Sequence, residues 1–261
     1  MGKKGTIVTY KPAISNAFTF LSRELKKVKI CNNTKPIDDA LIDLNSRKDN
    51  YGFWGYNLQK LVFNNIETPR GTMPNNVKSL QIVLSVEIHE RGLNGTDCFN
   101  PIIIDKTKGA QKNYNFSMEI FGYSDQNKVL SHWHLDFDSS SNNEYIHPDF
   151  HLTFGGNAMK SDGDDENQVF GKVLLIPSPR LPHPPMDAIL GIDFIIKNFV
   201  KKDIANAITC NPQYRKLIRQ SQERLWRPYM LSITKHWCNL SCSVYNTDSS
   251  LTKKYNPFLE D

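Results

Sequence analysis

The sequence predicts an α+β protein: an antiparallel meander sheet of about five or six strands, with helices packed on one face and a His/Asp-rich polar opposite face. Two observations support this prediction. From residue 79 onward, apolar and polar residues alternate with the period of two that defines a strand, and short turn-forming segments separate the alternating runs. From residue 184 onward, the apolar spacing becomes helical, and the segment 186–200 is apolar on nearly every side.

The chain is expected to form a single domain over residues 1–261. Its hydrophobic content of 39% and its charged content of 23% are ordinary for a globular protein, and they exclude wholesale disorder. In chain order the predicted parts are an N-terminal helical and loop region at 1–70, the antiparallel sheet at 77–178, C-terminal helices at 184–237 and a loose polar tail at 243–261.

Two helices are expected in the N-terminal region. Ser15 can cap the first helix, and Pro36 can open the second. The apolar stripe of the first helix has residues spaced three or four apart: Phe18, Leu21, Leu25 and Val28. The aromatic, glycine-broken segment 51–56 is expected to be a loop that packs onto the core.

The predicted sheet is built from runs with strand periodicity or short apolar runs between turn residues. These runs are 80–88, 102–104, 114–120, 129–138, 145–154 and 173–176. Among the C-terminal helices, the apolar one contains Asp193, a carboxylate that needs a buried partner, and Arg224 or Arg227 of the next helix could supply it. That next helix is expected over 214–226 and is stopped or kinked by Pro228.

Composition narrows the classes of partner and compartment. The net charge of +5 permits a nucleic-acid partner without requiring one. The five cysteines are scattered and odd in number, unlike a secreted disulfide framework, which indicates a cytoplasmic location. No run of about 18 apolar residues occurs, so no membrane span is expected.

Histidines are concentrated in one part of the predicted sheet. Five of the seven lie between residues 132 and 183, and four of them fall on the polar face of two successive runs, 129–138 and 145–154. Imidazole titrates near neutral pH and is the commonest metal ligand, so this is where chemistry is expected. The polar face of the two runs carries His132, His134, Asp136, His147, Asp149 and His151.

Strand pairing should bring these side chains together. A two-residue turn at 125–126 would place Glu119 opposite His132 and Ser117 opposite His134. Directly opposed side chains lie about 5 Å apart. A second loop that closes Ser139 against Glu144 would add three pairs, namely Asp136 with His147, Asp149 with His134, and His151 with His132.

Two chemistries suit such a patch. A pair of histidines with carboxylate support can cleave a phosphodiester without a metal, one imidazole acting as base and the other as acid. Alternatively, His132, His134 and His151 could ligate a divalent transition metal as cofactor. The non-catalytic interpretation is a solvated sheet face on which cross-strand His–Asp pairs form salt bridges.

The leading functional hypothesis is therefore a hydrolase that cleaves a phosphodiester, namely a nuclease acting on RNA or DNA. Its catalytic groups would be the four histidines and two aspartates of the patch. Substrate-binding residues would be Arg180 and His183 from a proline-rich corner, and Arg219 and Arg227 from the basic helix. The alternative is a non-catalytic adaptor or partner subunit of a larger protein complex, which would use the segment 51–56 and the C-terminal helices as contact surfaces.

Overall fold

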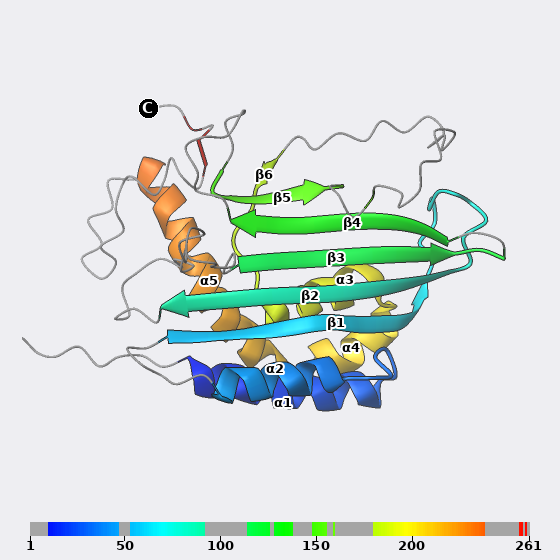
Figure 1. Cartoon of the computed structure of the whole chain (residues 1–261), viewed down its shortest axis with the longest axis horizontal. Coiled ribbons are helices and arrows are strands. Elements are labelled where there is room, and N and C mark those ends of the chain that lie inside the picture. Colours follow the sequence, from blue (N-terminus) through cyan, green and yellow to red (C-terminus); the bar gives the residue numbers. More distant parts are fainter. Residues whose placement is uncertain are drawn as a thin grey trace, which may run out of the picture.

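In the part of the chain that the structure describes, six strands form an antiparallel sheet, in which each strand pairs with the next in the order β1-β2-β3-β4-β5-β6 (Figure 1). The computed structural model describes residues 10–46, 53–91, 114–125, 128–137, 148–155 and 180–237, together with Met159, Asn256, Pro257 and Leu259. The predicted α+β class with an antiparallel sheet is confirmed. The expected strands at 102–104 and 173–176 and most of the expected tail at 243–261 lie outside the described residues.

The strands shorten from one edge of the sheet to the other. They are β1 (Phe53–Glu67), β2 (Ser79–Arg91), β3 (Tyr114–Tyr123), β4 (Lys128–Phe137), β5 (Phe150–Phe154) and β6 (Leu181–Pro182). Every pairing between neighbouring strands is antiparallel.

Strand β1 corrects the prediction of a loop over residues 53–56. Apolar and polar residues do not alternate regularly along this strand, because two irregularities interrupt its pairing with β2. They lie between Leu58 and Leu61 and between Phe63 and Ile66. Each irregularity changes the parity of the buried positions, and Lys60 takes a positive φ of 53° in the first of them. The buried residues are consequently Trp54, Tyr56, Leu58, Leu61, Phe63 and Ile66.

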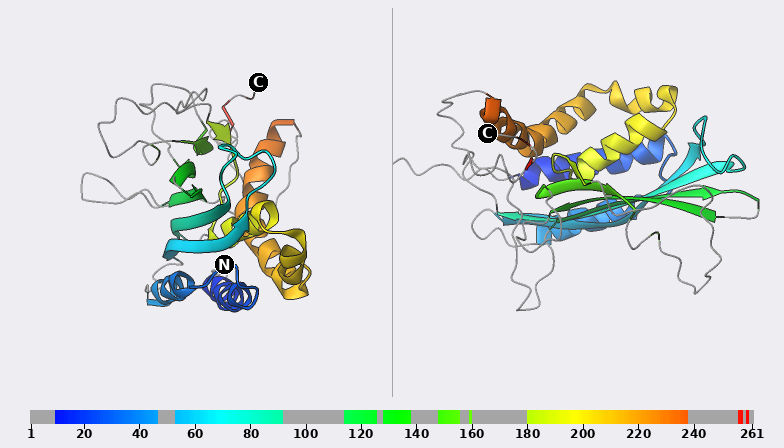
Figure 2. Two further views of the ribbon diagram at one scale, coloured as in Figure 1. Left: turned by 90° about the vertical axis from the view of Figure 1, so that its right-hand side faces the viewer. Right: turned by 90° about the horizontal axis from the view of Figure 1, so that it is seen from above.

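Helices pack against one face and one edge of the sheet. Helices α3 (Ala188–Phe199), α4 (Lys202–Thr209) and α5 (Pro212–Trp237) lie on one side, and α1 (Lys11–Lys27) and α2 (Lys35–Ser46) run along the β1 edge (Figure 2). Two buried tyrosines tie the sheet to the start of α3. The Ala188 N–H donates to the Tyr56 hydroxyl at 2.9 Å, and the Met186 N–H donates to the Tyr114 hydroxyl at 2.8 Å.

Two predicted helix boundaries are wrong. Helix α1 begins at Lys11, with Pro12 in its first turn, so Ser15 is not the cap and its hydroxyl instead donates to Asn45 of α2. Helix α5 continues through Pro228 to Trp237. The helix continues there because the residues on both sides of the proline, Leu225 and Tyr229, are buried against the rest of the protein.

A buried ion pair joins α3 to α5, but with partners different from those predicted. Asp187 caps the N-terminus of α3 by accepting from the Leu190 N–H at 2.8 Å, and it pairs with the guanidinium of Arg224. Asp193, for which an arginine partner was expected, instead accepts from the Tyr214 hydroxyl at 2.8 Å and from Lys197 at 2.9 Å. Helical spacing places Lys197 one turn after Asp193, which satisfies the carboxylate locally.

Candidate functional site

Several predicted site residues lie in rows that run across β3, β4 and β5. One row is formed by Ser117, His134 and Thr153, which are directly opposed across the three strands. Side chains alternate between the two faces of a strand, and the neighbouring Phe116 packs close to Gly191 of α3. The row therefore points away from α3, on the side of the sheet opposite α3 to α5 (Figure 2).

The first predicted register is confirmed, and the second is wrong. Glu119 is opposite His132 and Ser117 is opposite His134, as a short turn after β3 requires. In the second hairpin His151 lies opposite Asp136 and not opposite His132, a shift of four residues along β4. A shift of four residues keeps every side chain on the same face, so the apolar pattern does not distinguish the two registers.

His132 is held by hydrogen bonds to both of its ring nitrogens. Its Nδ1 lies 2.6 Å from the carbonyl oxygen of Gly155, and its Nε2 lies 3.0 Å from Ser117 Oγ. A carbonyl oxygen only accepts, so Nδ1 carries a proton and donates. In the neutral imidazole Nε2 therefore has a lone pair directed at the Ser117 hydroxyl.

Gly155 is shaped to hold that imidazole. It follows β5 with a φ of +99°, a conformation that favours glycine. Its N–H donates to the His132 carbonyl at 2.9 Å, while its own carbonyl accepts from the His132 ring. With both contacts in place, the His132 side chain is only 9% exposed.

His134 stacks on His132, with 5.3 Å between ring centroids and 22° between planes. Its Nε2 lies 3.2 Å from Asp136 Oδ2, so the carboxylate orients this second imidazole. The other nitrogen, Nδ1, is buried and has no hydrogen-bond partner among the described residues, and the same is true of Thr153 Oγ1 in the opposed position. Buried polar atoms are normally satisfied, so two such atoms in one row indicate a place for a water or a bound group.

The remaining predicted catalytic residues are placed less centrally. His151 is buried, with Nδ1 2.9 Å from the Pro148 carbonyl, and it faces Asp136. Asp149 lies in the bend before β5, outside the ladder, and the predicted pair with His134 is replaced by Thr153. His147 lies outside the described residues.

Arg180 and His183 flank the short strand β6, beside β5. The His183 N–H donates to the Phe150 carbonyl at 3.3 Å, and its Nδ1 donates to the Pro184 carbonyl at 2.6 Å. Burial lowers the pKa of His183 from 6.5, against an opposing effect of that last hydrogen bond. Burial therefore favours the neutral form of the His183 imidazole, which hydrogen bonds hold at the sheet edge.

Arg219 and Arg227 are not brought to the histidines. Both lie on α5, on the helical side of the sheet, and the exposed Arg219 pairs with Glu223 one turn along the helix. Within the described residues, no group of three His, Cys, Asp or Glu side chains is arranged to hold a metal ion. The predicted metal set of His132, His134 and His151 is thus not assembled as a metal centre.

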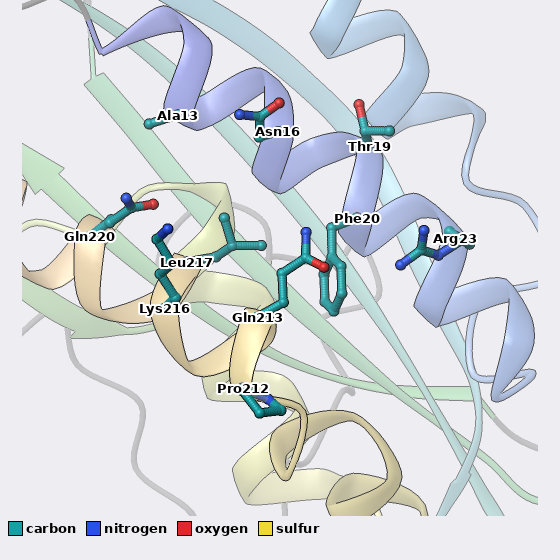
Figure 3. Close-up of a pocket in the computed structure, with 10 residues that line it drawn as sticks. All are labelled: Ala13, Asn16, Thr19, Phe20, Arg23, Pro212, Gln213, Lys216, Leu217 and Gln220. Atoms are coloured by element: carbon teal, nitrogen blue, oxygen red, sulfur yellow. The ribbon is translucent and has the colours of Figure 1, made fainter.

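A separate groove of about 780 Å³ opens between α1 and α5 (Figure 3). Its charged lining residues are Arg23 and Lys216, and Phe20 forms part of its floor. The Arg23 guanidinium lies over the Phe20 ring at 5.3 Å. The polar lining comprises Asn16, Thr19, Arg23, Gln213, Lys216 and Gln220.

The predicted catalytic, substrate-binding and metal-binding residues did not include Ser117, Thr153 or Gly155. Ser117 was placed opposite His134, but serine is too common on polar sheet faces to indicate a function by itself. The contact of Gly155 with His132 joins residues 23 positions apart and depends on the register of β5. Comparison with protein-family models, with curated proteins and with solved structures finds no match. None of the helices described here is long and apolar enough to cross a membrane.

Proposed function

We propose that the protein is a hydrolase that cleaves phosphodiesters in nucleic acid at the site formed by His132 and the row of Ser117, His134 and Thr153. His132 acts as general base and His134 as general acid. No step of this mechanism needs a metal ion. The odd number of scattered cysteines supports a cytoplasmic location, and Cys31 and Cys210 are free thiols.

The observation that carries the proposal is the unequal environment of two stacked imidazoles. His132 is held with a proton on Nδ1 and a lone pair on Nε2, which is the form a base needs. His134 has a carboxylate at Nε2 that can stabilise an imidazolium, while Nδ1 remains available to donate. Base and acid thus lie side by side in different environments, His132 between two hydrogen-bond partners and His134 beside a carboxylate.

A phosphodiester suits this site because its cleavage needs both functions at once. The attacking hydroxyl must lose a proton, and the leaving oxygen must gain one. His183 and Arg180, at the β5–β6 edge, are the predicted substrate-binding residues that remain on the sheet, whereas Arg219 and Arg227 no longer belong to the proposal. The net charge of +5 supports attraction of a polyanion.

The groove between α1 and α5 favours a second candidate, an adaptor that binds a protein partner. Its two cationic side chains, Arg23 and Lys216, would suit an acidic segment of that partner. The aromatic segment does not serve this function as expected, because Trp54 and Tyr56 are buried in the core. An adaptor would not require His132, which separates the two candidates.

Cleavage of fluorophore–quencher RNA and DNA oligonucleotides tests the hydrolase. His132→Gln and His134→Gln should each lower the rate by about 10²- to 10⁴-fold, the usual contribution of one acid or base. His89→Gln is the matched control, since His89 lies on β2 of the same sheet beside Glu87 and outside the row. Wild-type rates in both histidine variants, with unchanged thermal unfolding, would remove the hydrolase and leave the adaptor.

A further inference from the structure

We propose that Ser117 is the nucleophile of this site and that the reaction passes through a covalent phosphoseryl intermediate. This inference rests on the proposed function and deepens it, because it names the hydroxyl from which His132 takes its proton. The alternative is direct attack by water or by a substrate hydroxyl, with Ser117 serving only to position His132.

Three residues form the arrangement that an activated serine requires. The Ser117 hydroxyl lies 3.0 Å from His132 Nε2, and the other nitrogen of that ring is anchored on the Gly155 carbonyl at 2.6 Å. A nucleophile next to a base, and a base oriented by a third group, is the general pattern of nucleophilic catalysis by serine. Here a backbone carbonyl takes the place that a carboxylate occupies in the Ser-His-Asp arrangement.

A second serine, on β2 and outside the proposed site, provides a comparison. Ser85 is directly opposite Ser117 on β2, but its hydroxyl accepts a hydrogen bond from the Lys60 N–H at 3.0 Å. Ser85 therefore satisfies a backbone donor left free at the irregular part of β1, which is a structural role. Ser117 instead directs its hydroxyl to an imidazole.

Donors for the phosphoryl oxygens lie on the other side of Ser117. His134 is opposite Ser117 on β4, and Thr153 is opposite His134 on β5. Their buried Nδ1 and Oγ1 atoms have no hydrogen-bond partner among the described residues. Leaving such buried groups unsatisfied is unfavourable, and a phosphoryl oxygen bound in the row would supply the acceptor.

The chemistry balances in two steps. In the first, Ser117 Oγ attacks phosphorus, its proton passes to His132 Nε2, and the bond from phosphorus to the leaving oxygen breaks as His134 protonates that oxygen. In the second, water attacks the phosphoseryl phosphorus and gives a proton to His134, while His132 returns its proton to the departing Ser117 oxygen. The net reaction consumes one water and yields an alcohol and a phosphate monoester.

Labelling with an alkyl fluorophosphonate tests the nucleophile without knowledge of the substrate. The reagent forms a phosphorus–oxygen bond with an activated serine and releases fluoride, so intact mass and peptide mapping should find one adduct, on Ser117. Ser117→Ala should abolish the adduct, and His132→Gln should slow its formation by about 10²- to 10⁴-fold. Ser85→Ala, the matched control, should label at the wild-type rate.

Oligonucleotide cleavage by Ser117→Ala separates this inference from the proposed function. An unlabelled wild-type protein, or an adduct that persists in Ser117→Ala, would overturn the nucleophile. So would wild-type cleavage by Ser117→Ala when His132→Gln is inactive, and in that case the hydrolase would stand. Labelling of Ser117 in a protein that cleaves no nucleic acid would instead support the nucleophile and reject the substrate class.

Discussion

The buried pair of Asp187 and Arg224 should make a large contribution to the stability of the protein. Their side chains are 0% and 3% exposed, and the Asp187 carboxylate also accepts from Ser221 Oγ at 2.6 Å and caps α3 through the Leu190 N–H. Asp187→Asn keeps a residue that caps helices well, so the cap is retained and the charge alone is removed. Arg224 then remains buried as an uncompensated cation.

The expected loss follows from that burial. Removing one partner of a buried ion pair costs about 3–5 kcal/mol. The Arg224 guanidinium lies 5.4 Å from the Trp54 ring centroid and 5.6 Å from that of Tyr10, and cation–π attraction of about 1–2 kcal/mol compensates part of the cost. We therefore expect Asp187→Asn to lower the free energy of unfolding by about 3 kcal/mol, a large share of the roughly 5–15 kcal/mol typical of a domain.

Urea unfolding monitored by far-ultraviolet circular dichroism measures this loss in a double-mutant cycle. Arg224→Met should also be strongly destabilising, and the double variant should lose about 2 kcal/mol less than the sum of the single losses. Lys197→Met is the control, because its pair with Asp193 has a half-exposed lysine and should contribute less than about 1 kcal/mol. An Asp187→Asn protein within about 1 kcal/mol of wild type would refute the reasoning.

Two further predictions concern the sheet edge and the helix that crosses the sheet. Burial lowers the pKa of His183 from 6.5, so the unfolded chain takes up a proton first as the pH falls. The stability that depends on neutral His183 should be fully present above about pH 7 and lost as the pH falls through the folded-state pKa. The urea midpoint of His183→Gln should therefore change less between pH 8 and pH 5 than that of the wild-type protein. An equal change in both proteins would contradict this prediction. In Gly191→Ala, the new Cβ would lie 2.7 Å from Phe116 Cε2 and 3.1 Å from Leu84 Cδ2. Overpacking of about 1–3 kcal/mol should outweigh the roughly 1 kcal/mol gained in helix propensity, so the melting temperature should fall, and a rise would show that the core can adjust.

The sequence was informative wherever a short-range pattern determined the structure. Alternation identified β2, β3 and β4, and the short turn between β3 and β4 allowed the register of His132 and His134 to be predicted. The same reasoning failed for β1, because two irregularities reverse the parity of its buried residues. It failed for the pairing of β5 because residues 138–149 form too long a connection for the turn to determine the register.

Residue pattern alone therefore determined the α+β class, the antiparallel sheet, and the residues of β4 that share a face with His132 and His134. Tertiary structure decided which atoms of that face meet. The anchoring of His132 by Gly155, the opposition of His134 and Thr153, and the choice of Asp187 over Asp193 as the partner of Arg224 all join distant segments. Such contacts depend on strand register and on the packing of α5 against α3, neither of which leaves a periodic signal in the sequence, because periodicity reports the face of a residue and not its partner.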